Sequence, residues 1–319
     1  MKEQLQVQQP LQIYGQATAL LKQAQEFHHK EKLGVEEATF KPKITYPDLP
    51  IAILLATDIH YGSIRTHYDL LEKHLKAVED TPDVFMVSNG DEVDNFNSIF
   101  FASGQFENPL PPQLQTLAIL DRLKVLDKKK KIGVLSFGNH NDFMEDSGYT
   151  WLETFGKELP NTPLFTSGGL LHIKVGKELY DLAMTHTYWG KSKLNPTNAV
   201  KRFMDFEYPN ADIAFLGHTH QSEGLDFEKG GKDRVAVIGG TYKLDSDHWA
   251  RKRGIGMRTG QPGHTVLLWP KEHRMEHYKN FDSAISYMRA LIFMEEAKKG
   301  VTLYEYLGQP KSNGALATA

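Results

Sequence analysis

The stretch Ile51-Ala-Ile-Leu-Leu-Ala-Thr-Asp-Ile-His60 decides the fold, because a short apolar run ends directly in two side chains that can bind a metal ion. Four later runs, at 84–88, 132–137, 179–185 and 213–217, have the same form. A continuous apolar run of strand length predicts a strand that is covered on both faces. The polar residues that follow the five runs are Asp58 and His60, Asp91 and Asp94, Asn139 and His140, His186, and His218 and His220.

Helical patterns alternate with these strands at 69–79, 113–126 and about 195–206, and a last helix is expected at 283–299. Alternation of strands and helices predicts a layered α/β fold. The second helical pattern is expected to bury one row of leucines on a single side, namely Leu114, Leu117, Leu120 and Leu123.

Three hairpins are expected from alternating patterns on either side of a turn. They join 171–175 to the strand at 179–185, 225–227 to 234–238, and 264–269 to 274–278. Hairpins pair strands in an antiparallel manner, so the sheets should be mixed.

The composition of the 319 residues limits the function classes. Hydrophobic residues make up 40% and charged residues 24%, which excludes a disordered or fibrous chain. The net charge of −3 gives no global attraction to nucleic acid or to an anionic membrane, so any nucleic-acid binding must come from a local patch. Because the chain has no cysteine, metal ligands can only be His, Asp, Glu or Asn.

The chain is expected to divide into four parts: a polar, Gln-rich arm at 1–49, a main domain at 50–280, a helical extension at 281–309 and a tail at 310–319. The arm either packs outside the domain or forms an oligomer contact. No apolar run is long enough to cross a membrane and the amino terminus has no signal core, so we expect a cytoplasmic protein with no membrane contact.

The polar residues after the five strands should meet, because ligands bind beyond the carboxyl ends of strands in α/β sheets. Their types suit a pair of divalent ions. A carboxylate such as that of Asp91 can offer one oxygen to each of two ions, and an Asn carbonyl with imidazoles suits manganese, iron or zinc better than calcium. The glycines beside Asp91, Asn139 and His218 allow close backbone approach or a positive φ.

In order and spacing these five blocks resemble the calcineurin-like metallophosphoesterase superfamily over residues 51–243. The resemblance implies a four-layer αββα sandwich of two mixed β-sheets flanked by helices, and a phosphoester hydrolase with a dinuclear metal centre. It also implies the ligands of both ions and a general acid, His140, at the leaving group. One ion would be held by Asp58, His60, Asp91 and His220, and the other by Asp91, Asn139, His186 and His218.

One block departs from the family pattern, which usually has an acidic residue after Gly-Asn-His, where this chain has Asn141. The orientation and the pKa of His140 are therefore open at this point. Asp94 is expected to brace the site and not to bind metal.

The substrate class stays open between three readings. A phosphodiesterase on nucleic acid or nucleotides, like the DNA-repair nucleases of the superfamily, is favoured by two features. The aromatic segment at 95–112 either stacks a base or packs as a lid on the fold. The basic residues Arg251, Arg253 and Arg258, with His248 close by, either meet substrate phosphates or form a solvated loop. The second reading is a small-molecule phosphomonoesterase or a protein phosphatase. The third, a non-catalytic scaffold, is disfavoured because every ligand position is kept.

Overall fold

The computed structural model describes residues 22, 36–95, 108–141, 151–192, 194–244 and 260–307. It divides into two compact units, 1–36 and 37–319, and the description below concerns the second. The strands are β1 (Glu36–Phe40), β2 (Ile51–Ala56), β3 (Val84–Asn89), β4 (Ile132–Ser136), β5 (Leu164–Phe165), β6 (Gly169–Val175), β7 (Glu178–Thr185), β8 (Ile213–Leu216), β9 (Ser222–Lys229), β10 (Lys232–Gly239), β11 (Thr265–Leu268) and β12 (Met275–Tyr278). The helices are α2 (Tyr68–Asp80), α3 (Pro112–Lys128), α5 (Trp151–Glu158), α6 (Thr197–Phe206), α8 (Phe281–Lys298) and α9 (Leu303–Tyr306).

Two six-stranded sheets form the centre of this unit, in the orders β1-β6-β7-β8-β10-β9 and β12-β11-β2-β3-β4-β5. Both are mixed. In the second sheet β2, β3, β4 and β5 run parallel while β11 pairs antiparallel with β2. In the first, β7, β8 and β10 run parallel and the hairpins β6–β7 and β9–β10 add antiparallel pairs. The expected α/β sandwich of two mixed sheets is confirmed.

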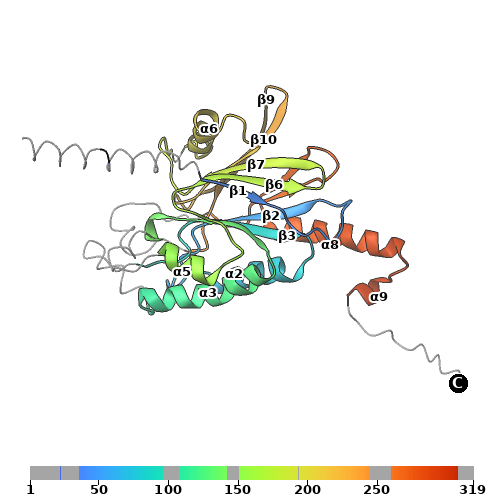
Figure 1. Ribbon diagram of the computed structural model, residues 1–319, viewed down its shortest axis with the longest axis horizontal. Helices are drawn as coiled ribbons and strands as arrows, with labels where there is room; N and C mark the ends of the chain where they lie inside the picture. Colours follow the sequence, from blue (N-terminus) through green and yellow to red (C-terminus); the bar gives the residue numbers. More distant parts are fainter. Residues whose placement is uncertain are drawn as a thin grey trace, which may run out of the picture. The chain divides into compact units, whose positions relative to one another are not determined.

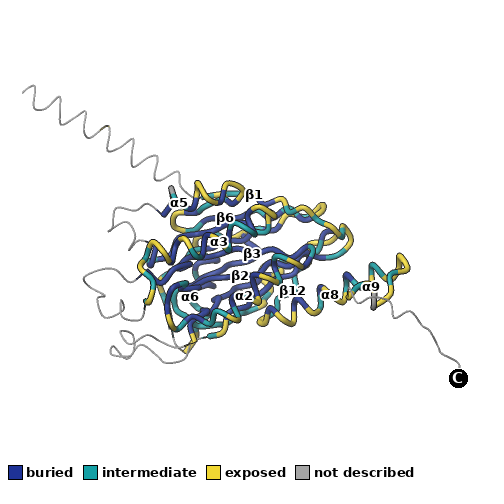
Figure 2. The backbone as a smooth tube through the Cα atoms, turned by 90° about the horizontal axis from the view of Figure 1, so that it is seen from below, coloured by how far each residue is buried: buried dark blue, intermediate teal, exposed yellow. Residues whose placement is uncertain are grey.

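The sequence of β2 explains the layering. Ile51, Ile53 and Leu55 pack into the core between the two sheets, whereas Ala52 and Leu54 pack into the core under the helices. Helices α2, α3, α5 and α8 cover this outer face of the second sheet, and α6 covers the outer face of the first (Figure 1). Figure 2 shows the strands buried behind helices whose outer sides are exposed. Alternate side chains of a strand point to opposite faces of the sheet, so a strand that is apolar throughout must be covered on both faces.

The five expected strands are confirmed as β2, β3, β4, β7 and β8, and the expected hairpins and helices also form. The leucine row expected on α3 is wrong in part, because Leu114 and Leu117 are 48% and 50% exposed. Leu120 and Leu123 are buried as expected, but Thr116 and Ile119 take the buried positions of the first turns, in a stripe that follows the helical period of 3.6. A row built on steps of three drifts off the buried side within two turns.

The polar range at 1–49 contains β1, which forms an edge of the first sheet. Phe40 at its end packs between the sheets, 5.4 Å from the ring of Phe85. The sandwich therefore extends into the range that the sequence assigned to the arm. Most of the Gln-rich arm before residue 36, and the whole tail at 310–319, lie outside the described residues.

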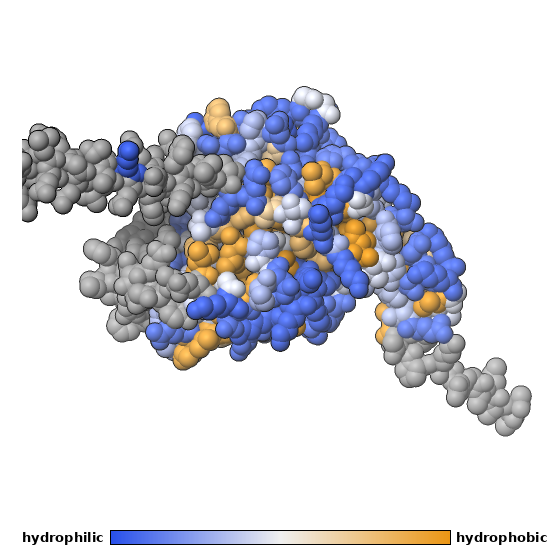
Figure 3. Space-filling view, in the orientation of Figure 1, coloured by the Kyte–Doolittle hydropathy of each residue, from blue (hydrophilic) through white to orange (hydrophobic). Residues whose placement is uncertain are grey.

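Hydrophobic side chains show in the middle of the face in Figure 3, with hydrophilic side chains above them, below them and to their right. Within the residues that the structure describes, no helix is both long and apolar enough to cross a membrane.

A buried histidine of α2 makes the stability depend on pH. His74 is 3% exposed, its Nδ1 lies 2.9 Å from the hydroxyl of Tyr242, and burial lowers its pKa from 6.5 to about 4. The unfolded chain therefore binds a proton at His74 more tightly than the folded chain does. The contribution of the neutral His74 to the free energy of unfolding is fully present above about pH 6.5 and is lost as the pH falls toward 4. We expect the protonation of His74 in the unfolded chain to lower the free energy of unfolding by about 2 kcal/mol between about pH 7 and pH 5. Urea unfolding of the parent and of His74→Gln should give a shallower pH dependence for the variant, and parallel curves would contradict this.

Candidate metal centre

The five motif blocks lie at the carboxyl ends of five strands, as expected. Asp58 and His60 follow β2, Asp91 follows β3, Asn139 and His140 follow β4, His186 follows β7, and His218 and His220 follow β8. Three of these strands belong to one sheet and two to the other, so the site joins both sheets at one edge of the sandwich.

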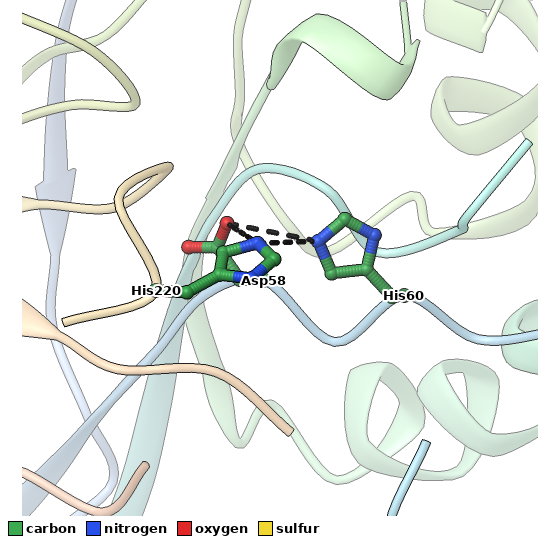
Figure 4. A group of neighbouring side chains, drawn as sticks. All are labelled: Asp58, His60 and His220. Atoms are coloured by element: carbon green, nitrogen blue, oxygen red, sulfur yellow. Dashed lines mark hydrogen bonds and ion pairs between the residues drawn. The ribbon is translucent and has the colours of Figure 1, made fainter. Parts of the chain in front are cut away.

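A first group consists of Asp58, His60 and His220, whose ligand-type atoms all lie within 4.8 Å of one another. The two Nε2 atoms of His60 and His220 are 3.0 Å apart, and they lie 3.7 and 3.2 Å from Asp58 Oδ1. The three side chains point toward one another (Figure 4). Asp58 Oδ1 is buried and accepts no hydrogen bond from the described part of the chain. A buried carboxylate oxygen needs a partner, so this atom is suited to bind a cation.

A second group consists of Asp91, His186 and His218. His186 Nε2 lies 3.0 Å from Asp91 Oδ2, while its Nδ1 donates to the carbonyl oxygen of Asn89 at 2.6 Å. Because a carbonyl can only accept, the proton is on Nδ1 and Nε2 is left to face the carboxylate. Asn139 joins this group, since its Oδ1 lies 2.6 Å from His218 Nδ1.

Asp91 belongs to the second group and also faces the first. Its Oδ2 is 3.0 Å from His186 Nε2 of the second group and 3.9 Å from His60 Nε2 of the first. The other oxygen, Oδ1, accepts from the backbone N–H of His140 at 2.9 Å, which fixes the carboxylate plane. This is the placement of a carboxylate that can serve both groups.

The pKa values of His186 and Asp58 show that the two groups attract positive charge. Burial alone would lower the pKa of His186, yet Asp91 and Asp58 raise it to about 10. Burial alone would raise the pKa of Asp58, yet His186 and His220 hold it well below its usual value. The buried carboxylates thus favour the protonated form of the imidazoles. Protons on the histidines supply the positive charge that a bound cation would otherwise supply.

The backbone at the site is held in an uncommon conformation. Eight described residues other than glycine have a positive φ, and five of them are candidate ligands: Asp58 at 49°, His60 at 51°, Asp91 at 57°, His218 at 68° and His220 at 56°. Each such residue costs on the order of 1 kcal/mol, and strain of this kind gathers at functional sites. The sequence could not show it.

Two glycines allow the blocks to approach, as the sequence predicted. A Cβ on Gly138 would lie 2.1 Å from Asp91 Oδ1, and a Cβ on Gly217 would lie 2.2 Å from Thr57 Oγ1. Any side chain at either position would push two motif blocks apart.

Asp94 orients two histidines, and the lysine that neutralises it was missed by sequence reasoning. Asp94 Oδ1 lies 2.8 Å from His60 Nδ1 and accepts from the buried ammonium of Lys243 at 2.7 Å. The contact to Nδ1 turns Nε2 of His60 toward Asp58. The backbone carbonyl of Asp94 accepts from His140 Nδ1. Lys243 carried no signal because it lies outside the five blocks.

His140 faces the same centre. Its ring is 4.6 Å from the ring of His60, its Nε2 lies 4.0 Å from Asp91 Oδ2, and burial lowers its pKa. Since Nδ1 donates to a carbonyl, Nε2 is the atom that can carry a proton into the site.

Asn141, the departure from the family pattern, braces the backbone. Its Oδ1 accepts from the backbone N–H of Gly138 at 2.8 Å and of Asp91 at 3.2 Å, and its Nδ2 donates to Glu92 Oε2 at 3.4 Å. Burial raises the pKa of Glu92 to about 7. An amide suits this position because a carboxylate there would face the buried Glu92 carboxyl.

The remaining expected site residues cannot be placed. His248, Arg251, Arg253 and Arg258 lie outside the described residues, as does most of the aromatic segment, at 96–107.

A family model of the calcineurin-like phosphoesterases matches residues 51–222, which is more than half of the chain and includes all five motif blocks. The chain belongs to this family. Calcineurin-like phosphoesterases are hydrolases of phosphoester bonds, and the buried His and Asp groups are candidate metal sites of the kind typical of the family. A search of curated proteins gave no match.

Several solved structures resemble the phosphoesterase domain at low identity. Vps29 from Entamoeba histolytica in complex with zinc is 11% identical, covering 72% of this chain and 97% of that one, with a TM-score of 0.34. Nuclease MPE from Pseudomonas putida is 13% identical, covering 71% and 87%, with a TM-score of 0.33. A hypothetical protein from Thermus thermophilus is 15% identical, covering 72% and 98%, with a TM-score of 0.37.

Proposed function

We propose that this phosphoesterase hydrolyses phosphodiesters of nucleic acid or nucleotides with two divalent ions, manganese, iron or zinc. The observation that carries the proposal is the pair of buried groups on either side of Asp91, one with Asp58 Oδ1 lacking a hydrogen bond among the described residues. His nitrogens with carboxylate and amide oxygens are the donor set of these metals.

The ligand assignment follows from the contacts. One ion would be held by Asp58, His60, Asp91 and His220, and the other by Asp91, Asn139, His186 and His218. The Nδ1 atoms of His60 and His186 are already engaged by Asp94 and by the Asn89 carbonyl, so their Nε2 atoms are the ones offered.

The chemistry divides between the ions and the protein. Two bound cations lower the pKa of a water and neutralise phosphate oxygens. Asp91 keeps the two groups at a fixed separation. His140, with Nδ1 tied to the Asp94 carbonyl, delivers a proton from Nε2 to the departing alkoxide.

The substrate class is tested by comparing four substrates with manganese present. Bis-p-nitrophenyl phosphate, single-stranded DNA and cyclic nucleotides are diesters, and p-nitrophenyl phosphate is a monoester. We expect the diesters to be hydrolysed with the higher kcat/KM. A strong preference for the monoester would replace the proposal with a phosphomonoesterase or a protein phosphatase. No hydrolysis of any substrate with manganese, iron or zinc would favour a scaffold.

Asp94 gives a prediction on metal affinity. Removing its carboxylate alone would leave the Lys243 ammonium buried without that partner, so the test uses the double variant Asp94→Asn with Lys243→Gln. Because His60 loses its orienting partner, we expect metal affinity to fall about 10- to 100-fold. Titration calorimetry with manganese measures this. An unchanged affinity in a folded double variant would show that Asp94 does not act through His60.

A further inference from the structure

The segment 187–191, directly after His186, adjoins the metal centre. It lines an open hollow of about 500 Å³ that is formed by Thr187, Tyr188, Trp189, Gly190 and Lys191. Lys191 also lines a smaller recess with Gly217, Thr219 and Gln221, which flank the two histidines after β8. Lys191 therefore lines both the hollow and a recess beside the candidate ligands.

Lys191 supplies a positive charge at this position. Its side chain has no hydrogen-bond or ion-pair partner within the described ranges of the chain, and the residue is exposed. Lys191 lines the same recess as Gly217 and Thr219, the two residues on either side of His218. The ammonium is thus within electrostatic reach of the metal centre, and it suits a phosphate oxygen.

Trp189 supplies an aromatic surface beside this charge. It is 55% exposed. The Arg202 guanidinium of α6 lies 3.8 Å from the ring centroid, and the ring of Tyr188 lies 5.5 Å away at 35°. The Arg202 guanidinium holds the Trp189 ring in place on one face, and part of the ring stays accessible to solvent. A nucleobase can stack on such an aromatic surface.

We propose that the segment 187–191 binds an unpaired nucleotide next to the scissile phosphate, with Lys191 on a phosphate oxygen and Trp189 stacked on the base. The inference rests on the proposed phosphodiesterase and narrows its substrate to single-stranded nucleic acid. A base within a duplex is already stacked on its neighbours, so it has no free face for Trp189 unless it is taken out of the helix.

The test measures binding separately from hydrolysis. A labelled single-stranded oligonucleotide with phosphorothioate linkages is titrated, in the presence of manganese, into the parent protein and into Trp189→Ala and Lys191→Ala. We expect Trp189→Ala to weaken binding about tenfold, and the parent to bind the matching duplex about tenfold more weakly than the single strand. Lys191→Ala should weaken binding and reduce the slope of log Kd against log salt by about 0.7.

Matched variants separate recognition from damage to the fold. Trp189→Phe and Lys191→Arg should keep most of the affinity. Lys177→Ala removes an exposed lysine at the opposite end of β7 and should change nothing. Equal binding of duplex and single strand by the parent, or a Trp189→Ala affinity within twofold of the parent, would overturn the inference. If the parent binds the single strand as expected but hydrolyses no phosphoester with any metal, the proposed function fails while the binding site stands.

Discussion

Replacing Asp91 with Asn is expected to lower kcat by on the order of 10³-fold or more on every phosphoester, because Oδ2 of this carboxylate lies near a histidine of each buried cluster. The amide keeps the volume and can still accept from the backbone N–H of His140, so the fold should persist. Steady-state kinetics with manganese, together with the metal content of the purified variant, measure the effect.

The matched control is Asp83→Asn. Asp83 is also buried, with a positive φ, at the opposite end of β3, where its carboxylate accepts from the backbone N–H groups of Thr45 and Tyr46. This variant should lose stability and keep its turnover. A parent-like rate in Asp91→Asn, or an equal loss in Asp83→Asn, would contradict the assignment of Asp91.

Replacing His140 with Ala should have the second largest effect, and the effect should depend on the leaving group. A general acid contributes about 10² to 10⁴ to the rate where the leaving alkoxide needs a proton. We therefore expect a loss of this size on an alkyl or nucleotide ester and a much smaller loss on a p-nitrophenyl ester. Metal content should stay at the parent level, because His140 is not among the ligands assigned to either ion and its Nδ1 donates to the Asp94 carbonyl.

Comparing the two leaving groups in the same variant is its own control for folding. A damaged fold would lower both rates by the same factor. Equal losses on both esters, or loss of metal from the variant, would therefore show that His140 is not the acid.

The strands and the positions that follow them could be predicted because both signals are local. Residues 51–60 show why, since six apolar residues buried on both faces are followed at once by the polar residues of the strand end. Parallel pairing then brings separate blocks to the same edge, which needs no knowledge of side-chain contacts.

The supporting contacts could not be predicted because they join residues far apart in the sequence. Lys243 neutralises Asp94 across 149 positions. Asp and His adopt a positive φ more often than most residues, but residue type alone does not say which of them do so at the five candidate ligands. The role of Asn141 became clear only from its contacts with the backbone and with Glu92. On α3 the leucine spacing was misleading, because burial followed the geometry of the packed helix and not the row of largest apolar residues.

Anomalous scattering from crystals grown with manganese tests the central claim most directly. The account predicts two peaks about 3.5 to 4 Å apart with Asp91 between them. One should be bound by Asp58, His60 and His220, and the other by Asn139, His186 and His218. A single peak, or ions bound away from Asp91, would contradict a dinuclear centre at this edge of the sandwich.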